Sequence, residues 1–172
     1  MQVGGADFLS YLGVSVAGMA ETPITDDRWP AEVVTSMIEH VLDLAETWTK
    51  WDGTPRVVDD RTYTPHKAIR RVADHLVDHL AEMEARLCGA PALPDRWHAS
   101  AVTTEADLAE FTPEDLDEAR SRLTRLGQIW AARLDNLTED LLDRRERDAW
   151  SIRQLAFHVA GSTYYADAVG RL

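Results

Sequence analysis

Two histidines stand at matching places in a repeated local pattern. Residues 69–76 read Ile-Arg-Arg-Val-Ala-Asp-His-Leu, and residues 152–159 read Ile-Arg-Gln-Leu-Ala-Phe-His-Val. Both segments follow the order Ile-Arg-x-apolar-Ala-x-His-apolar, which puts His75 and His158 in the same position. Neutral imidazole is the commonest protein ligand for divalent transition metals. The pair therefore predicts a metal site, provided that the two segments pack side by side.

A third ligand is expected within one helical turn of these histidines. At roughly 100° per residue, each histidine falls near one edge of its apolar stripe, and the residue four later lies further inward. Those residues are His79 and Ser162, while Gln154 lies four residues before His158. A hydroxyl or an amide binds zinc or nickel weakly, whereas imidazole binds them well. The sequence thus favours His75, His79 and His158 as ligands of a divalent transition metal, with zinc or nickel the expected ion.

The same histidines also admit a structural interpretation. A single buried histidine is more often a hydrogen-bonded core residue than a ligand. Two histidines at matching positions of a repeated pattern favour a metal site. Polar residues in the core of a non-catalytic bundle would explain the same pattern. Both interpretations stay open on the sequence alone.

The elements that must position these residues are helices. Apolar residues recur at spacings of three and four, as amphipathic helices require. Thr64-Pro65, Thr112-Pro113 and Ser151 are typical helix starts, and Gly89 and Gly170 are typical stops. The predicted helices cover residues 30–51, 64–89, 112–136 and 151–169.

These helices predict an all-α fold, a four-helix bundle with a long connection between helices two and three. Residues 90–111 form that connection, because Pro91 and Pro94 interrupt it and no period is evident beyond a short helix. The bundle domain is expected at residues 30–172. Residues 1–29 precede it as an N-terminal segment for which the sequence favours no one structure.

Composition narrows the class of protein. A chain of 172 residues with 45% hydrophobic and 28% charged residues is one globular domain. The net charge of −12 and the lack of a basic stripe argue against nucleic-acid binding. Neither a long apolar run nor a secretory signal pattern is present, so we expect no membrane span and a cytoplasmic location. The single Cys88 excludes an internal disulfide and any CxxC motif.

Residues 70–76 and 150–160, which carry the histidine pattern, resemble the DinB/YfiT-like metal-binding four-helix bundles. This family includes the N-terminal domain of the mycothiol-dependent maleylpyruvate isomerase, and the resemblance spans roughly residues 30–172. In the family, a histidine of the second helix joins two ligands four residues apart on the last helix. The likeness gives these roles to His75 and His158. This chain departs at the remaining position, where Ser162 and Gln154 flank His158.

The resemblance implies a metal-dependent transferase or isomerase. In such an enzyme the ion lowers the pKa of a low-molecular-weight thiol such as mycothiol, and the resulting thiolate attacks a small-molecule substrate. We expect a homodimer of bacterial origin. The alternative is a non-catalytic dimeric helical bundle that acts as a small-molecule-binding or regulatory module.

Overall fold

Helices make up most of the molecule. The computed structural model describes residues 27–93, 101–145 and 150–172. The long helical elements within these ranges are α2 (Pro30–Ala45), α3 (Pro65–Leu87), α4 (Pro113–Asp135), α6 (Ile152–Ala160) and α7 (Tyr164–Val169). Shorter helical elements are η1 (Trp48–Lys50), η2 (Ala106–Leu108), α5 (Glu139–Asp143) and η3 (Gly161–Thr163). The predicted all-α class is confirmed, whereas most of the segment 1–29 lies outside the described residues.

Side-chain caps begin three of the long helices where the sequence predicts them. Thr64 accepts a backbone hydrogen bond at the start of α3. Thr112 with Asp115, and Ser151 with Gln154, form reciprocal capping boxes at the starts of α4 and α6. Each box satisfies backbone N–H groups that have no partner inside the helix, which fixes where the helix begins.

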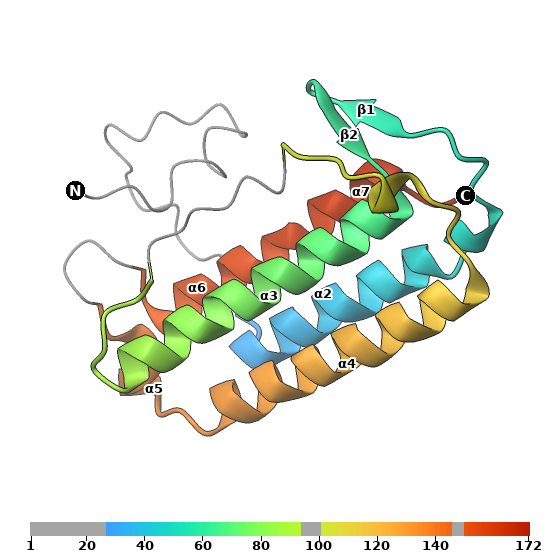
Figure 1. The fold of residues 1–172 in the computed structure, drawn as a ribbon. Coiled ribbons are helices and arrows are strands. Elements are labelled where there is room, and N and C mark those ends of the chain that lie inside the picture. Colours follow the sequence, from blue (N-terminus) through green and yellow to red (C-terminus); the bar gives the residue numbers. More distant parts are fainter. Residues whose placement is uncertain (1–26, 94–100, 146–149) are drawn as a thin grey trace.

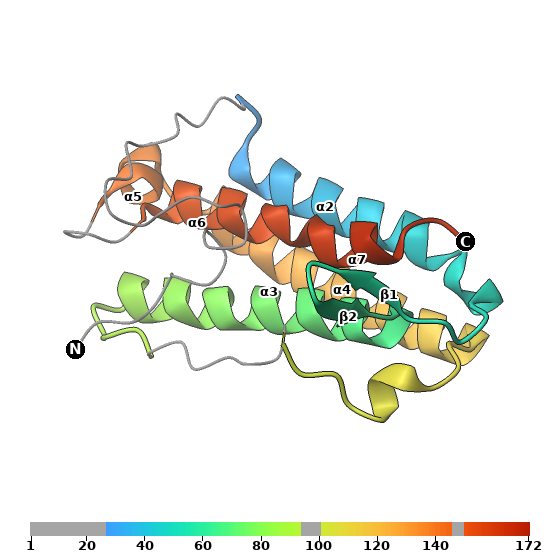
Figure 2. The same cartoon turned by 90° about the horizontal axis from the view of Figure 1, so that it is seen from above.

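The long helices lie side by side in two layers. α3 runs along α6 and α7, while α2 runs along α4 (Figure 1). The layers also contact each other, through α2 with α6 and α3 with α4, as the second view shows (Figure 2). The second predicted helix therefore packs against the last one, which is the condition for a metal site shared by His75 and His158.

Close contacts between helices hold α4 in place. Trp130 of α4 is fully buried, and its Nε1 donates to the backbone oxygen of Leu76 in α3, at 3.0 Å. Gly127, also on α4, faces α2 so closely that an added Cβ would lie 2.7 Å from Cδ1 of Ile38. Glycine therefore allows α2 and α4 to approach at this point.

Two of the predicted helices end or break earlier than expected. The first was predicted over residues 30–51, but α2 ends at Ala45 and is followed by a turn and η1. The last was predicted as one helix over 151–169, but η3 separates α6 from α7. Gly161, Ser162 and Thr163 have low helix propensity, which favours a tighter 3₁₀ turn here.

A small hairpin that the sequence interpretation missed precedes α3. Strands β1 (Arg56–Val58) and β2 (Arg61–Tyr63) pair antiparallel. The two-residue turn between them places Asp59 and Asp60 at positive φ, 47° and 62°, as a type I′ hairpin turn requires. The hairpin lies beside α7 and the start of α3 (Figure 2).

The connection before α4 is anchored on α3 by a partly buried ion pair. Arg70 donates to Asp107 through Nε, at 3.0 Å, and through Nη2, at 2.7 Å. The backbone N–H of Thr104 donates to the same carboxylate at 2.8 Å. Over residues 101–112 the connection contains only η2, as predicted, whereas residues 94–100 lie outside the described ranges. None of the helices in those ranges combines the length and apolar character that a membrane span needs.

Candidate metal centre

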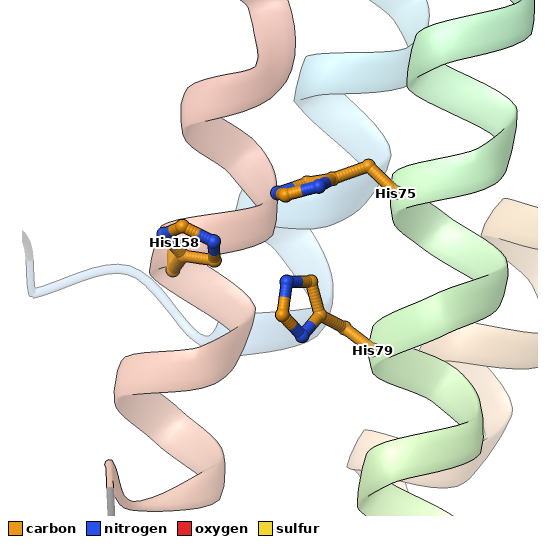
Figure 3. A group of neighbouring side chains, drawn as sticks. All are labelled: His75, His79 and His158. Carbon is orange, nitrogen blue, oxygen red and sulfur yellow. The ribbon is translucent and has the colours of Figure 1, made fainter. Parts of the chain in front are cut away.

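Three imidazole rings meet between α3 and α6. His75 and His79 lie one turn apart on α3, and His158 faces them from α6 (Figure 3). The ring centroids of His75 and His79 are 4.6 Å apart, and each lies 4.9 Å from the centroid of His158. One possible ligand nitrogen from each ring lies within 4.8 Å of the other two. The structure thus brings together all three residues that the sequence predicted as ligands.

Helix packing explains why the rings converge. Leu76 on α3 and Leu155 and Val159 on α6 are fully buried, and they fix which faces of the two helices meet. His75 precedes one of these leucines and His158 precedes the buried valine, so both rings fall at the edge of the same seam. The repeated sequence pattern therefore becomes a repeated spatial position.

The donor set suits a divalent transition metal. Tetrahedral coordination with bonds of about 2.0–2.1 Å requires donor atoms about 3.4 Å apart. The three nitrogens lie within 4.8 Å of one another. Side-chain rotations that bring these atoms at most about 1.4 Å closer would give the tetrahedral spacing. Three imidazoles also match zinc and nickel better than magnesium or calcium, which prefer oxygen ligands.

Two of the rings are held in the neutral form that binds metals. Burial lowers the pKa of His75 well below its ordinary value, and the charges of His79, His158 and Arg71 lower it further. Burial, together with the charge of His79, lowers the pKa of His158 to about 3. Both imidazoles are therefore neutral at neutral pH, and no proton has to leave them before a metal binds.

A carboxylate orients the third ring. Nδ1 of His79 lies 2.9 Å from Oε2 of Glu82, one turn further along α3. Burial raises the pKa of Glu82, but the hydrogen bond with His79 and the positive charge of Arg86 act in the opposite direction, and the pKa of Glu82 is lowered. Glu82 is thus ionised at neutral pH and accepts a hydrogen bond from Nδ1 of His79.

Arg86 and Trp150 complete the surroundings. Nη1 of Arg86 lies 3.6 Å from Oε1 of Glu82, and Nη2 donates to the backbone oxygen of Trp150 at 2.7 Å. The Trp150 ring centroid lies 4.4 Å from that of His158. The sequence interpretation missed Glu82 and Arg86. The spacing of three between His79 and Glu82, which places them on one helix face, is the signal that identifies this contact.

Neither of the other two candidates for the third ligand joins the cluster. The Ser162 hydroxyl is fully buried and directed at Sδ of Met37, 3.9 Å away. Oε1 of Gln154 accepts a hydrogen bond from the backbone of Ser151 at 2.9 Å, within the α6 capping box. Both side chains therefore have structural roles, which leaves His79 as the third imidazole.

Comparison of the chain with protein-family models, curated proteins and solved structures finds no match. The likeness to the DinB/YfiT-like bundles therefore remains a prediction that rests on the two histidine motifs.

Proposed function

We propose that this chain is a metal-dependent enzyme built on a four-helix bundle. Its long elements α2, α3, α4 and α6–α7 would form the bundle, and His75, His79 and His158 would bind a divalent ion, zinc or nickel. The observation that carries the proposal is the convergence of three ligand nitrogens within 4.8 Å from two adjacent helices. Three protein ligands that leave an open position are typical of catalytic metal sites.

Thiol chemistry is the reaction class that we assign to this centre. A bound ion with an open position supplies the positive charge that lowers the pKa of a thiol or a water molecule. The resemblance of the histidine motifs favours a low-molecular-weight thiol such as mycothiol, and hence a thiol-dependent transferase or isomerase acting on a small molecule. We place this activity in a cytoplasmic homodimer.

The chain's own side chains prepare the site for that role. His75 and His158 stay neutral because they are partly buried, and Oε2 of Glu82 lies within hydrogen-bond distance of Nδ1 of His79. The fully buried Leu76, next to His75, excludes bulk water from the inner side of the cluster. A preorganised site that is partly shielded from water strengthens electrostatic interactions with a bound substrate.

Cobalt substitution tests the proposal directly. Co²⁺ is a spectroscopic substitute for zinc, and a thiol that binds it produces a sulfur-to-cobalt charge-transfer band. We expect this band when mycothiol or a simpler thiol is added to the Co²⁺-loaded, tag-free protein. We expect no band from His158→Ala, because the variant lacks one of the ligands.

The alternative function, a non-catalytic helical bundle, predicts a different result in this experiment. If Co²⁺ binds but no thiol adds to it, the thiol-dependent assignment is wrong although the metal centre stands. If the protein binds no transition metal, the three histidines form a polar part of the core. The chain would then be better explained as a non-catalytic dimeric bundle that binds small molecules or regulates a partner.

A further inference from the structure

We infer that Glu82 is a positioning residue of the histidine cluster, and that it fixes the proton of His79 on Nδ1 so that Nε2 faces His75 and His158. The inference rests on the proposed function where it concerns metal affinity. The position of the proton on His79 is also a property of the metal-free protein, and it can be measured there separately.

The contact between His79 and Glu82 determines which nitrogen of His79 carries the proton. A neutral imidazole has one N–H donor and one acceptor nitrogen, and a carboxylate can only accept. Because Oε2 of Glu82 lies 2.9 Å from Nδ1, the proton of neutral His79 belongs on Nδ1. One ring nitrogen of His79 points toward the other two rings, and the second points away from them (Figure 3). Since Nδ1 contacts Glu82, the unprotonated Nε2 is left for the centre of the cluster.

Glu82 brings a negative charge close to the proposed metal ion. Three neutral imidazoles contribute no negative charge, so a divalent ion among them would keep its full charge. Glu82 places a carboxylate one hydrogen bond away, in a site where its side chain is 30% exposed and that of His79 is 18% exposed. A carboxylate on the far nitrogen makes a ligating histidine more basic and fixes its orientation.

Arg86 pairs with Glu82 and restricts its position. Its side chain is only 7% exposed, and it lies on α3 one turn beyond Glu82. Glu82 thus divides its two oxygens, with Oε2 toward His79 and Oε1 toward Nη1 of Arg86. The hydrogen bond from Arg86 to the backbone oxygen of Trp150 connects this group to the segment that leads into α6 and His158.

A purely structural ion pair between Glu82 and Arg86 is the competing explanation. The two explanations differ in the effect of Glu82→Gln. Glutamine keeps an oxygen that accepts from Nδ1 of His79, but it loses the ion pair with Arg86. A structural pair predicts that Gln and Ala variants lose similar stability and leave the proton on His79 unchanged. A positioning role predicts that Gln preserves the proton position and Ala does not.

The first experiment measures the position of the proton in metal-free, tag-free protein by ¹⁵N NMR. It is run at about pH 8, where an ordinary histidine is neutral. We expect the Nδ1–H form of His79 in the parent protein and in Glu82→Gln, and the Nε2–H form in Glu82→Ala. An Nε2–H form in the parent protein, or no change in Glu82→Ala, would overturn the inference. This result does not depend on any metal.

The second experiment measures Co²⁺ affinity from the visible absorption of the bound ion. Loss of an outer partner of a ligating histidine costs about 10–100-fold in metal affinity. We expect a loss of that size for Glu82→Ala and a clearly smaller one for Glu82→Gln. Glu84→Ala is the matched control, since Glu84 lies on the same helix but pairs with Arg133, and it should bind Co²⁺ like the parent.

These measurements distinguish the positioning role of Glu82 from the proposed metal-dependent function. Unchanged Co²⁺ affinity in Glu82→Ala would overturn the positioning role at the metal site. A parent protein that binds no Co²⁺ would contradict the proposed function instead, and the NMR result alone would then decide where the proton of His79 resides.

Discussion

The ring centroids of His75 and His158 lie 4.9 Å apart, although the two residues belong to the second and the last long helices of the chain. The contact arises because the same local pattern occurs on two helices that pack along each other. Burial at this seam lowers the pKa of both rings. Packing, protonation and the capacity to bind a metal are therefore linked at one place in the fold.

The stability of the metal-free protein should fall in acid because of these partly buried rings. The pKa of His158 is about 3 in the folded protein, against an ordinary value of 6.5. Between these two values the unfolded chain binds more protons than the folded one, so the free energy of unfolding decreases as the pH falls from about 6.5 toward 3. Each such group contributes at most about 1.4 kcal/mol per pH unit. Urea unfolding in the presence of a chelator, at a series of pH values, measures this slope.

His158→Gln should make that slope shallower, because glutamine does not titrate. Ser162→Ala is the control, since Ser162 does not titrate and its hydroxyl faces Met37 rather than the cluster, and its slope should match that of the parent. A His158→Gln variant with the parental slope would show that burial of this ring does not govern the acid response.

Gly127 should tolerate substitution by alanine but not by a larger residue. An alanine Cβ would lie 2.7 Å from Cδ1 of Ile38, which is the end of a flexible side chain. Alanine is favoured over glycine in a helix by about 1 kcal/mol, which offsets the cost of moving Ile38. Thermal or urea unfolding should therefore show Gly127→Ala within about 1 kcal/mol of the parent. Gly127→Leu should lose about 2 kcal/mol or more.

The neighbouring Gln128 provides the control for this change, because it lies on the exposed face of α4. Gln128→Leu adds a comparable side chain without entering the contact with α2. Equal losses in the Gly127→Leu and Gln128→Leu variants would contradict the close approach of α2 and α4.

Asp107 should contribute more to stability than an exposed acid. Its carboxylate is almost fully buried and accepts hydrogen bonds from Arg70 and from the backbone of Thr104. Asp107→Ala leaves these donors without their acceptor and should cost about 1–3 kcal/mol. The midpoint of urea unfolding measures the loss. Asp117→Ala, which removes an 80% exposed partner of Arg120, should change stability by less than about 1 kcal/mol.

Much of the fold follows from local sequence signals. Thr64, Thr112 and Ser151 each supply a cap in the structure, and the apolar stripes that follow them form the faces that pack together. Ligand chemistry favours His79 over Ser162 as the third ligand, and the structure places His79 beside His75 and His158. Both inferences depend on residues within one or two helical turns of each other.

Features that depend on backbone detail or on contacts between segments were harder to predict. The hairpin is short, and the positive φ angles of Asp59 and Asp60 are adopted by residues other than the usual Asn-Gly pair. The 3₁₀ turn at Gly161–Thr163 alters the helical phase, so a uniform 100° per residue cannot place α7 relative to α6. The bond between Arg86 and the backbone of Trp150 joins segments distant in sequence, and no local pattern encodes it.

Metal content is the most direct measure of the central claim. Tag-free protein, loaded with Zn²⁺ or Ni²⁺, dialysed and analysed for elements, should retain about one ion per chain, as three imidazoles with an open position predict. His75→Ala, His79→Ala and His158→Ala should each lose the ion, whereas Ser162→Ala should retain it because that hydroxyl faces Met37. Folded parent protein that retains no metal, or retention that survives His79→Ala but not Ser162→Ala, would contradict the account.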